Sequence, residues 1–308
     1  MKLSEELIVR LTRKLLAALA KPTAPQASRI LWIPVLFVGV FFLFLPGYVY
    51  SFKGDLEGGK RGGGMRGEAR DRGAESERSW IQETGLTPVF PEGFRCASIS
   101  SPFASRFDGA GNRRNPSIHG GKHGGVDIGF QVGHPEVAMA DGEIIAKGPA
   151  EGDGAQMEGI FLWMRHSPQD TGLPFWVFNK YQHLKELPSL EVGSRIKAGD
   201  VVALGGDTGT YSRKFGVSLP HLHVSTFIAE QGDFRVLGRD ANLVKVEDSL
   251  HVDMMALFVK GITLETAKEN PSYTNIEKTL QVAVVDSLGG RSDANAKIVW
   301  PVVCNFPQ

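Results

Sequence analysis

The clearest chemical pattern in the 308-residue chain is a pair of potential metal ligands around two glycines, in the sequence KHGGVD (122–127). Histidine and aspartate both bind zinc, and a catalytic zinc site uses three protein ligands and keeps one open position. In a fully extended strand His123 and Asp127 would lie about 13 Å apart, too far to share one ion. The two glycines allow the backbone to bend and bring these side chains together. Alone, the His-x-x-x-Asp spacing is more typical of a polar loop.

Two further segments carry histidines. The sequence PHLHVSTFI (220–228) alternates like a β-strand, so His221 and His223 would share one face while the aliphatic residues between them anchor the other face in a core. One histidine could then bind a metal and leave the other free for proton transfer. His183 follows a predicted strand in YQHL (181–184), where an isolated histidine is more often a structural residue.

Taken together and in this order, the motifs become specific. His-x-x-x-Asp, Tyr-x-His-Leu, Gly-Asp-Thr-Gly (206–209) and Pro-His-Leu-His resemble the LytM/lysostaphin-type zinc metalloendopeptidases, which cut peptide bonds in bacterial peptidoglycan. The resemblance covers about residues 115–230 and includes the segment 134–142. Four motifs in one order at compatible distances are a far stronger signal than any one of them.

The resemblance implies a role for each of these residues. His123, Asp127 and His223 would hold Zn²⁺, and His183 and His221 would face the zinc-bound water and the scissile carbonyl. Zinc lowers the pKa of such a water toward about 7 and polarises the carbonyl. One of the two remaining histidines would act as general base or stabilise the tetrahedral intermediate, and the sequence leaves open which does which.

Other polar residues near the motifs have more ordinary interpretations. His119 could compete with His123 as a ligand, but only His123 has the family spacing. His166 is expected to make a structural hydrogen bond, and His134 and His251 to be surface or core residues. Lys122 and Arg114 could bind carboxylates of the substrate, although a solvated loop is the simpler interpretation. Departures from the family pattern bear on substrate preference; they are the segment 211–219, Ser225-Thr226 after the second histidine, and an apparent insertion at 167–174.

The elements that must position these residues are short β-like runs separated by Gly, Pro, Asp and Asn, beginning near residue 91. We expect an all-β domain with a compact antiparallel sheet core, and the resemblance adds a groove over the zinc. The Asp141-Gly142 dipeptide predicts a tight hairpin between strands at 137–140 and 143–146. Residues 248–259 are the one stretch with helical character. The predicted strands are 160–165, 176–183, 201–204, 221–228, 281–285 and 297–303.

Residues 30–50, from Ile30 to Tyr50, form an apolar run without an ionisable side chain other than tyrosine, long enough to cross a bilayer as a helix. The 29 residues before it carry six basic and two acidic side chains, which predicts a cytoplasmic N-terminus and an outward-facing remainder. A cleaved signal peptide is the second interpretation, and no suitable cleavage site follows. We therefore expect a single-pass anchor in the cell (inner) membrane with a periplasmic or extracellular domain.

These features divide the chain into four parts: an amphipathic cytoplasmic tail (1–29), a transmembrane anchor (30–50), a linker rich in glycine and charge (51–90) and a metallopeptidase domain with a C-terminal extension (91–308). Cys96 and Cys304 lie near the two ends of the domain. An outward location would permit a disulfide between them, and two buried thiols are the alternative.

The composition limits the kinds of partner. The 34 basic and 34 acidic residues cancel, so the chain has no general affinity for nucleic acid. The leading hypothesis is a membrane-anchored zinc endopeptidase that hydrolyses peptidoglycan stem peptides or cross-links, with any regulatory protein partner unknown. The alternatives are a non-catalytic module that binds the wall or activates another hydrolase, and the same chemistry on an extracellular protein.

Overall fold

The computed structural model describes residues 81–116, 119–150, 158–210, 219–237 and 244–306. The predicted tail, the anchor at 30–50 and the linker up to residue 80 lie outside these residues. Within the part that is described, no helix combines the length and the apolar character needed to cross a membrane. All of the described residues fall within one compact unit.

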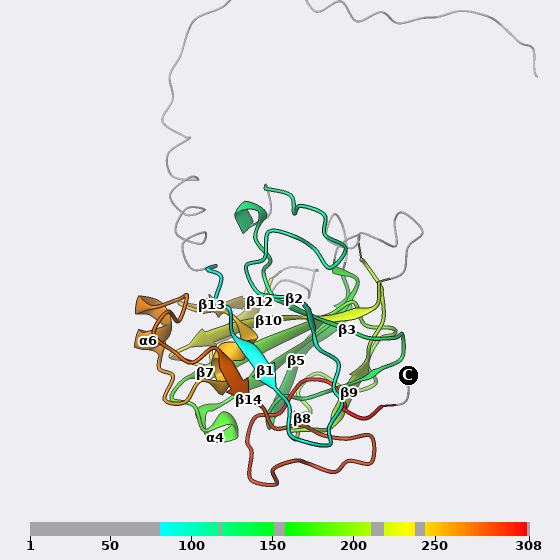
Figure 1. Cartoon of the computed structure of the whole chain (residues 1–308). Coiled ribbons are helices and arrows are strands. Elements are labelled where there is room, and N and C mark those ends of the chain that lie inside the picture. Colours follow the sequence, from blue (N-terminus) through cyan, green and yellow to red (C-terminus); the bar gives the residue numbers. More distant parts are fainter. Residues whose placement is uncertain (1–80, 117–118, 151–157, 211–218, 238–243, 307–308) are drawn as a thin grey trace, which may run out of the picture. The chain divides into compact units, whose positions relative to one another are not determined.

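The centre of this unit is an eight-stranded sheet in which every pairing is antiparallel (Figure 1). Seven strands follow one another across it, and the eighth, β13 (Leu250–Val252), pairs with part of β10. In spatial order the seven are β2 (Ile99–Ser101), β3 (Val126–Gly129), β10 (His221–Ala229), β7 (Trp176–Gln182), β6 (Ile160–His166), β5 (Gly142–Pro149) and β8 (Arg195–Ile196).

Three two-stranded sheets and short helices surround the main sheet. The strand pairs are β1 (Thr87–Val89) with β14 (Thr279–Gln281), β4 (Pro135–Val137) with β9 (Val201–Leu204), and β11 (Phe234–Val236) with β12 (Val244–Val246). The β1–β14 pair is parallel, unlike the main sheet. The helices in the described ranges are α4 (Pro168–Thr171), α6 (Leu264–Glu269) and the 3₁₀ turns η1 (His119–Gly121) and η3 (Met254–Phe258).

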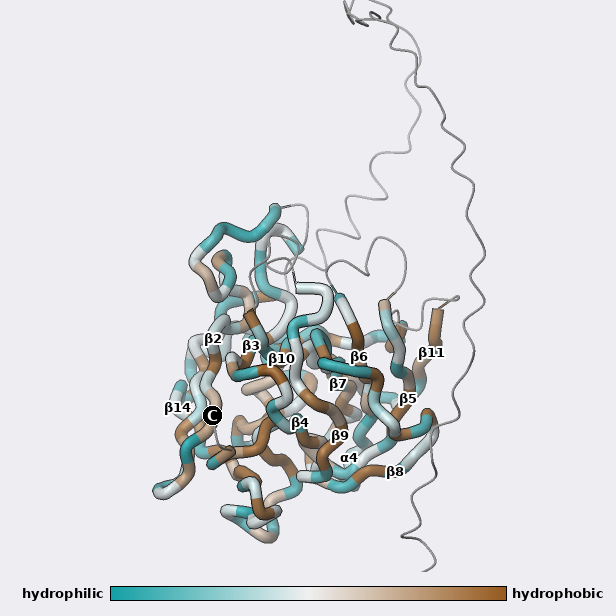
Figure 2. Tube along the Cα trace, turned by 90° about the vertical axis from the view of Figure 1, so that its right-hand side faces the viewer, coloured by the Kyte–Doolittle hydropathy of each residue, from teal (hydrophilic) through white to brown (hydrophobic). Residues whose placement is uncertain are grey.

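The alternation predicted for β10 places an apolar core on one side of the sheet. Leu222 and Val224 have no exposed surface, and they pack with Val126 and Ile128 of β3 in the largest hydrophobic cluster. A second cluster, which includes Phe161 of β6, lies on the other side. Figure 2 shows the hydrophobic segments along the strands and the more hydrophilic ones in the loops above them. Burial of both faces thus holds the central strands, and with them the histidines, in place.

The predicted strands at 160–165, 176–183, 201–204 and 221–228 are confirmed by β6, β7, β9 and β10. The predicted hairpin at Asp141-Gly142 is wrong, because β4 pairs with β9 whereas β5 pairs with β6 and β8. Asp141 accepts hydrogen bonds from Ala198 N and Lys197 Nζ, so it links the turn between β4 and β5 to the turn between β8 and β9. Gly142 is needed for space, since a Cβ there would overlap the ring of His166.

The predicted helical stretch at 248–259 is also wrong in its first half. Residues 250–252 form β13, because the edge of β10 offers backbone partners between Thr226 and Ile228. Only then does a 3₁₀ turn follow, with the Asp253 carboxylate accepting the N–H of Met255 at its start.

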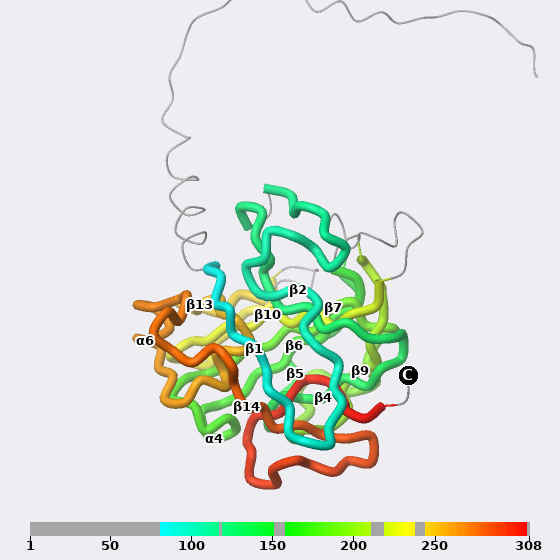
Figure 3. Tube along the Cα trace, in the orientation of Figure 1, coloured from blue at the N-terminus to red at the C-terminus, as the bar shows by residue number. Residues whose placement is uncertain are grey.

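The ends of the folded unit are joined to each other. Cys96 and Cys304 form a disulfide, which decides between the two alternatives left open by the sequence. The C-terminal segment runs beside β4, where Val137 N donates to Pro301 O and Val303 N donates to Pro135 O (Figure 3). Ile81 and Leu86, which the sequence assigns to the linker, are buried in the core. The folded part therefore already includes residues 81–90.

Candidate metal centre

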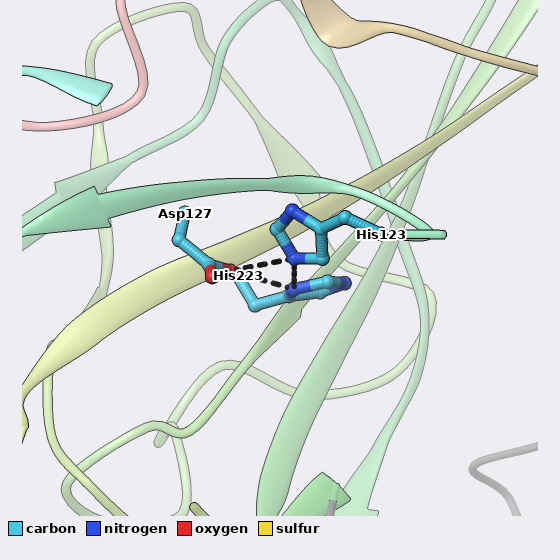
Figure 4. Close-up of side chains that lie close together, drawn as sticks. All are labelled: His123, Asp127 and His223. Carbon is cyan, nitrogen blue, oxygen red and sulfur yellow. Dashed lines mark hydrogen bonds and ion pairs between the residues drawn. The ribbon is translucent and has the colours of Figure 1, made fainter. Parts of the chain in front are cut away.

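Two neighbouring strands and the loop before one of them bring the predicted metal ligands together (Figure 4). Asp127 on β3 lies directly opposite His223 on β10 in the strand register. His123 precedes β3, and the bend at Gly124-Gly125 turns its ring back over the strand, as the two glycines predict. Asp127 and His123 are buried, whereas the side chain of His223 is 15% exposed.

The three side chains form a triangle of ligand atoms with almost equal sides. His123 Nε2 lies 3.1 Å from His223 Nδ1 and 3.1 Å from Asp127 Oδ1, and His223 Nδ1 lies 2.8 Å from the same oxygen. Ligands held about 2.0–2.1 Å from a tetrahedral zinc lie about 3.3 Å from each other. The donor set, two imidazole nitrogens and one carboxylate oxygen, is one that zinc accepts. These residues therefore fit a zinc ion.

Hydrogen bonds on the far side of each ring select the nitrogen that faces the cluster. His123 Nδ1 lies 3.0 Å from Pro102 O and donates to it, which leaves Nε2 with its lone pair toward the cluster. His223 Nε2 donates to Ser225 Oγ at 3.1 Å, which leaves Nδ1 toward the cluster. Partners of this kind fix the tautomer and orientation of metal-binding histidines. The role of Ser225 was not predicted, although its position two residues after His223 on the same strand face is a usable signal.

The neighbouring histidines and Arg114 stabilise the negative charge of Asp127. Burial raises the pKa of this carboxyl group, but the neighbouring His123 and His223 outweigh it and hold the pKa well below its usual value. Arg114 NH2 lies 3.4 Å from Asp127 Oδ2 and donates to Ser101 Oγ at 2.9 Å. Arg114 thus contacts the cluster itself, a different contact from the substrate carboxylate considered from the sequence.

His183 lies immediately after β7 in the left-handed region, with φ 66°. Its Nδ1 donates to Thr208 O at 2.8 Å, which leaves Nε2 as an acceptor. Thr208 is held in turn, because its hydroxyl donates to Leu184 O and accepts from Ile160 N. The Gly-Asp-Thr-Gly motif therefore serves to hold His183. Burial, and then the nearby His221 and His223, lower the pKa of His183 well below its usual value.

His221 completes the group of five predicted site residues. Its Nδ1 donates to Leu219 O at 2.7 Å, and its Nε2 lies 3.7 Å from Asp127 Oδ1. The rings of His183 and His221 are 4.7 Å apart between centroids, and those of His183 and His223 are 6.0 Å apart. The structure thus brings all five residues into one site, with His183 and His221 beside the triangle.

The remaining histidines and Lys122 lie elsewhere. His166 Nδ1 donates to Asp141 O at 2.8 Å, the structural hydrogen bond that the sequence predicts, and the buried His134 Nε2 contacts Val303 O. Lys122 Nζ donates to the backbone carbonyl of Ile81. His119 is outside the ligand triangle, and its ring lies 6.1 Å from that of His251.

Comparison with known proteins places this site in a family. The model of peptidase family M23 matches residues 121–233. Glycyl-glycine endopeptidase ALE-1 from Staphylococcus capitis is 35% identical over 106 residues, which are 34% of this chain and 25% of that protein. An uncharacterized metalloprotease from Haemophilus influenzae is 30% identical over 154 residues, which are 50% of this chain and 26% of that protein. The match thus spans only about a quarter of each relative.

Among solved structures, the catalytic domain of the antimicrobial peptidase lysostaphin from Staphylococcus simulans matches with 22% identity and a TM-score of 0.30. That match covers 43% of this chain and 80% of the lysostaphin domain. The family match begins just before His123 and ends shortly after β10, so it contains all five site residues. Residues 121–233 form a peptidase family M23 domain.

Proposed function

We propose that this protein is a membrane-anchored zinc endopeptidase that hydrolyses peptide bonds in the stem peptides or cross-links of peptidoglycan. The observation that carries the proposal is the convergence of His123, Asp127 and His223 on one point, with His183 and His221 beside it. A structural zinc site is usually closed by four protein ligands, whereas a catalytic one keeps a position open. Three converging ligands with two further histidines therefore favour catalysis over a purely structural metal.

His123, Asp127 and His223 would hold the zinc through Nε2, Oδ1 and Nδ1. When bound there, zinc would supply a Lewis acid that polarises a peptide carbonyl and acidifies water. The carboxylate and the two tautomers are already fixed by Pro102, Ser225 and Arg114, so little rearrangement is needed to bind the ion. This support from the second layer of residues is what keeps a metal site selective and tight.

His183 and His221 would carry out proton transfer during hydrolysis. Each donates its Nδ1–H to a backbone carbonyl, so each presents Nε2 to the site. A low pKa keeps His183 neutral at physiological pH, and a neutral imidazole can accept a proton at Nε2. The pair thus offers one nitrogen to take a proton from the attacking water and a second to stabilise developing charge or protonate the leaving amine.

The substrate and the location rest on the family and on the N-terminal sequence. A relative of the M23 domain is a glycyl-glycine endopeptidase, which supports a peptide substrate. An anchor at residues 30–50 with a cytoplasmic N-terminus would place the domain on the outer side of the membrane, where peptidoglycan lies. The disulfide between Cys96 and Cys304 suits an oxidising compartment of that kind.

The direct test is digestion of purified peptidoglycan by the full-length protein, with mass spectrometry of the released fragments. We expect new amine termini with the wild type and none with His183→Ala, which should still bind zinc because His183 is not a ligand. Lys185→Ala is the matched control, because Lys185 is exposed two residues away. Bound zinc without any new amine terminus would contradict the enzyme and favour the non-catalytic wall-binding module.

The anchor needs its own test. The full-length chain, expressed in a bacterium, should stay in the membrane fraction after an alkaline carbonate wash and require detergent for release. A chain without residues 1–50 should appear in the soluble fraction. Recovery of the full-length chain in the soluble fraction would contradict the anchor without bearing on the peptidase.

A further inference from the structure

A chain of hydrogen bonds runs away from the metal centre behind His223. His223 Nε2 donates to Ser225 Oγ at 3.1 Å, and Ser225 Oγ donates to Gly124 O at 3.1 Å. The Gly124 carbonyl belongs to the loop that carries His123. It therefore connects two of the three proposed ligands, and whatever holds it affects both.

His251 reaches this loop from outside the M23 match. It lies on β13 opposite Phe227 of β10, and its ring stacks on that of Phe227 at 4.4 Å between centroids. Phe103 contacts the same ring edge-on at 5.4 Å. A Cβ added to Gly124 would lie 3.3 Å from His251 Cε1, so the imidazole packs directly against this glycine.

His251 is neutral in this environment. Burial, and next the neighbouring His119, lower its pKa to about 3, against a hydrogen bond with the backbone of Gly124 that raises it. A neutral imidazole has one N–H donor and one acceptor nitrogen. One ring nitrogen is hydrogen-bonded to the backbone of Gly124, so the other nitrogen needs a hydrogen-bond partner on the opposite side of the ring.

A small cavity lies on that side of the His251 ring. It is lined by His251 of β13 and by Tyr273, which follows α6 in the C-terminal extension, and Figure 1 shows α6 near β13. His251 Nε2 and Tyr273 Oη are both buried, and neither has a hydrogen-bond partner among the described residues. Buried polar atoms of this kind are normally satisfied by protein or by ordered water. The cavity has room for about one water molecule.

We propose that this cavity holds one ordered water that joins Tyr273 Oη to the imidazole of His251, and that His251 is a positioning residue for the metal centre. The water and Tyr273 hold the imidazole, the imidazole holds the Gly124 carbonyl, and that carbonyl orients Ser225 and His223. The C-terminal extension thereby supports the metal ligands from a position 50 residues beyond His223. This inference rests on the proposed role of His223 as a ligand.

The test compares the zinc affinity of full-length variants by competition with a chelator, together with the visible spectrum of the Co²⁺-substituted proteins. His251→Phe keeps the ring stack on Phe227 but removes both nitrogens, and we expect a loss of about 10-fold in zinc affinity and an altered cobalt spectrum. Tyr273→Phe removes only the hydroxyl and should cause a smaller change in the same direction. His251→Asn or His251→Gln, which each retain an amide donor, should recover part of the affinity.

His166→Phe is the matched control. His166 is also a buried strand histidine whose Nε2 has no partner among the described residues, but its Nδ1 is bonded to the carbonyl of Asp141, which lies outside β3, β10 and the loop of His123. It should lose stability without changing the cobalt spectrum. If folded His251→Phe binds zinc as tightly as the wild type with the same spectrum, the positioning role is wrong.

A crystal structure at high resolution tests the water directly and does not depend on whether His251→Phe folds. Electron density for a water within hydrogen-bond distance of Tyr273 Oη and His251 supports the proposal, and a dry cavity contradicts it. A wild-type protein that binds no zinc would instead contradict the proposed function, and with it the role of His251 in metal binding, whatever the cavity contains.

Discussion

Gly125 and the imidazole of His223 are packed so closely that a Cβ on Gly125 would lie 2.5 Å from His223 Nε2 and 2.6 Å from Val224 O. The second glycine of the His-Gly-Gly-Val-Asp sequence is therefore required by the space that a metal ligand occupies. The contact with His223 explains why position 125 must be glycine, which the need for a flexible backbone alone does not explain.

Gly125→Ala should displace His223 and disrupt the metal centre. We expect at least a 10-fold loss of zinc affinity, measured by chelator competition, because one of three ligands moves. Gly129→Ala, at the other end of β3, is the control, since a Cβ there would lie 3.4 Å from Ser100 Cβ, an ordinary contact. Equal zinc affinity in the two variants would show that the contact is not restrictive.

Gly159→Ala should separate catalysis from metal binding. Gly159 has a φ of +63°, and a Cβ on it would overlap the Thr208 carbonyl that accepts from His183. Displacing that carbonyl turns His183 out of position, and misplacement by about 1 Å costs about 100-fold in rate. We expect peptidoglycan hydrolysis to fall by that factor with zinc content unchanged.

The control for backbone strain at this position is Gly133→Ala, which has a φ of +91° and no atom within 4 Å of the added Cβ. It should retain hydrolysis. A Gly159→Ala protein with wild-type activity would show that the Thr208 carbonyl does not orient His183.

The grouping of the five residues could be predicted because their motifs, in this order, resemble those of the LytM/lysostaphin-type peptidases, and the structure brings the five side chains together. The pairing of Asp127 with His223 could not be derived locally, since it depends on the register of strands about 100 residues apart. The same limit explains the wrong hairpin prediction. The sequence suggests that Gly142 serves a tight turn, whereas the structure requires glycine there because the ring of His166 leaves no room for a Cβ. Strands with strong alternation, such as β10, were found within one residue.

A buried carboxyl group gives a prediction for stability against pH. Both oxygens of Glu136 are buried without a hydrogen-bond partner among the described residues, and burial raises its pKa well above the usual value. Above about pH 4.3 the unfolded state releases a proton that the folded state keeps. The contribution of Glu136 to stability is therefore complete below that pH and is lost as the pH rises toward the pKa of the folded state.

Glu136→Gln should flatten this dependence. The wild type should lose up to about 1.4 kcal/mol of unfolding free energy per pH unit from this group, and the variant should not. Urea unfolding at pH 5 to 8 measures the difference, with Glu186→Gln as the exposed control. Parallel pH profiles for the wild type and Glu136→Gln would mean that Glu136 is ionised in the folded protein.

The disulfide should matter for stability and not for the metal. Cys96 and Cys304 are separated by 208 residues, and closing so long a loop stabilises the folded state by about 5 kcal/mol in the chain-entropy model. The double variant Cys96→Ser/Cys304→Ser should unfold at lower urea while its zinc content stays the same, because the ligands lie on β3, β10 and the loop before β3. Loss of zinc in a folded double variant would contradict this separation.

The central claim is that His123, Asp127 and His223 hold one zinc ion while His183 serves the reaction. Elemental analysis of the purified full-length protein after desalting measures this directly. The wild type and His183→Ala should each contain about one zinc per chain, and His223→Ala should have lost most of it. A His223→Ala protein that retains stoichiometric zinc would contradict the assignment of the metal centre.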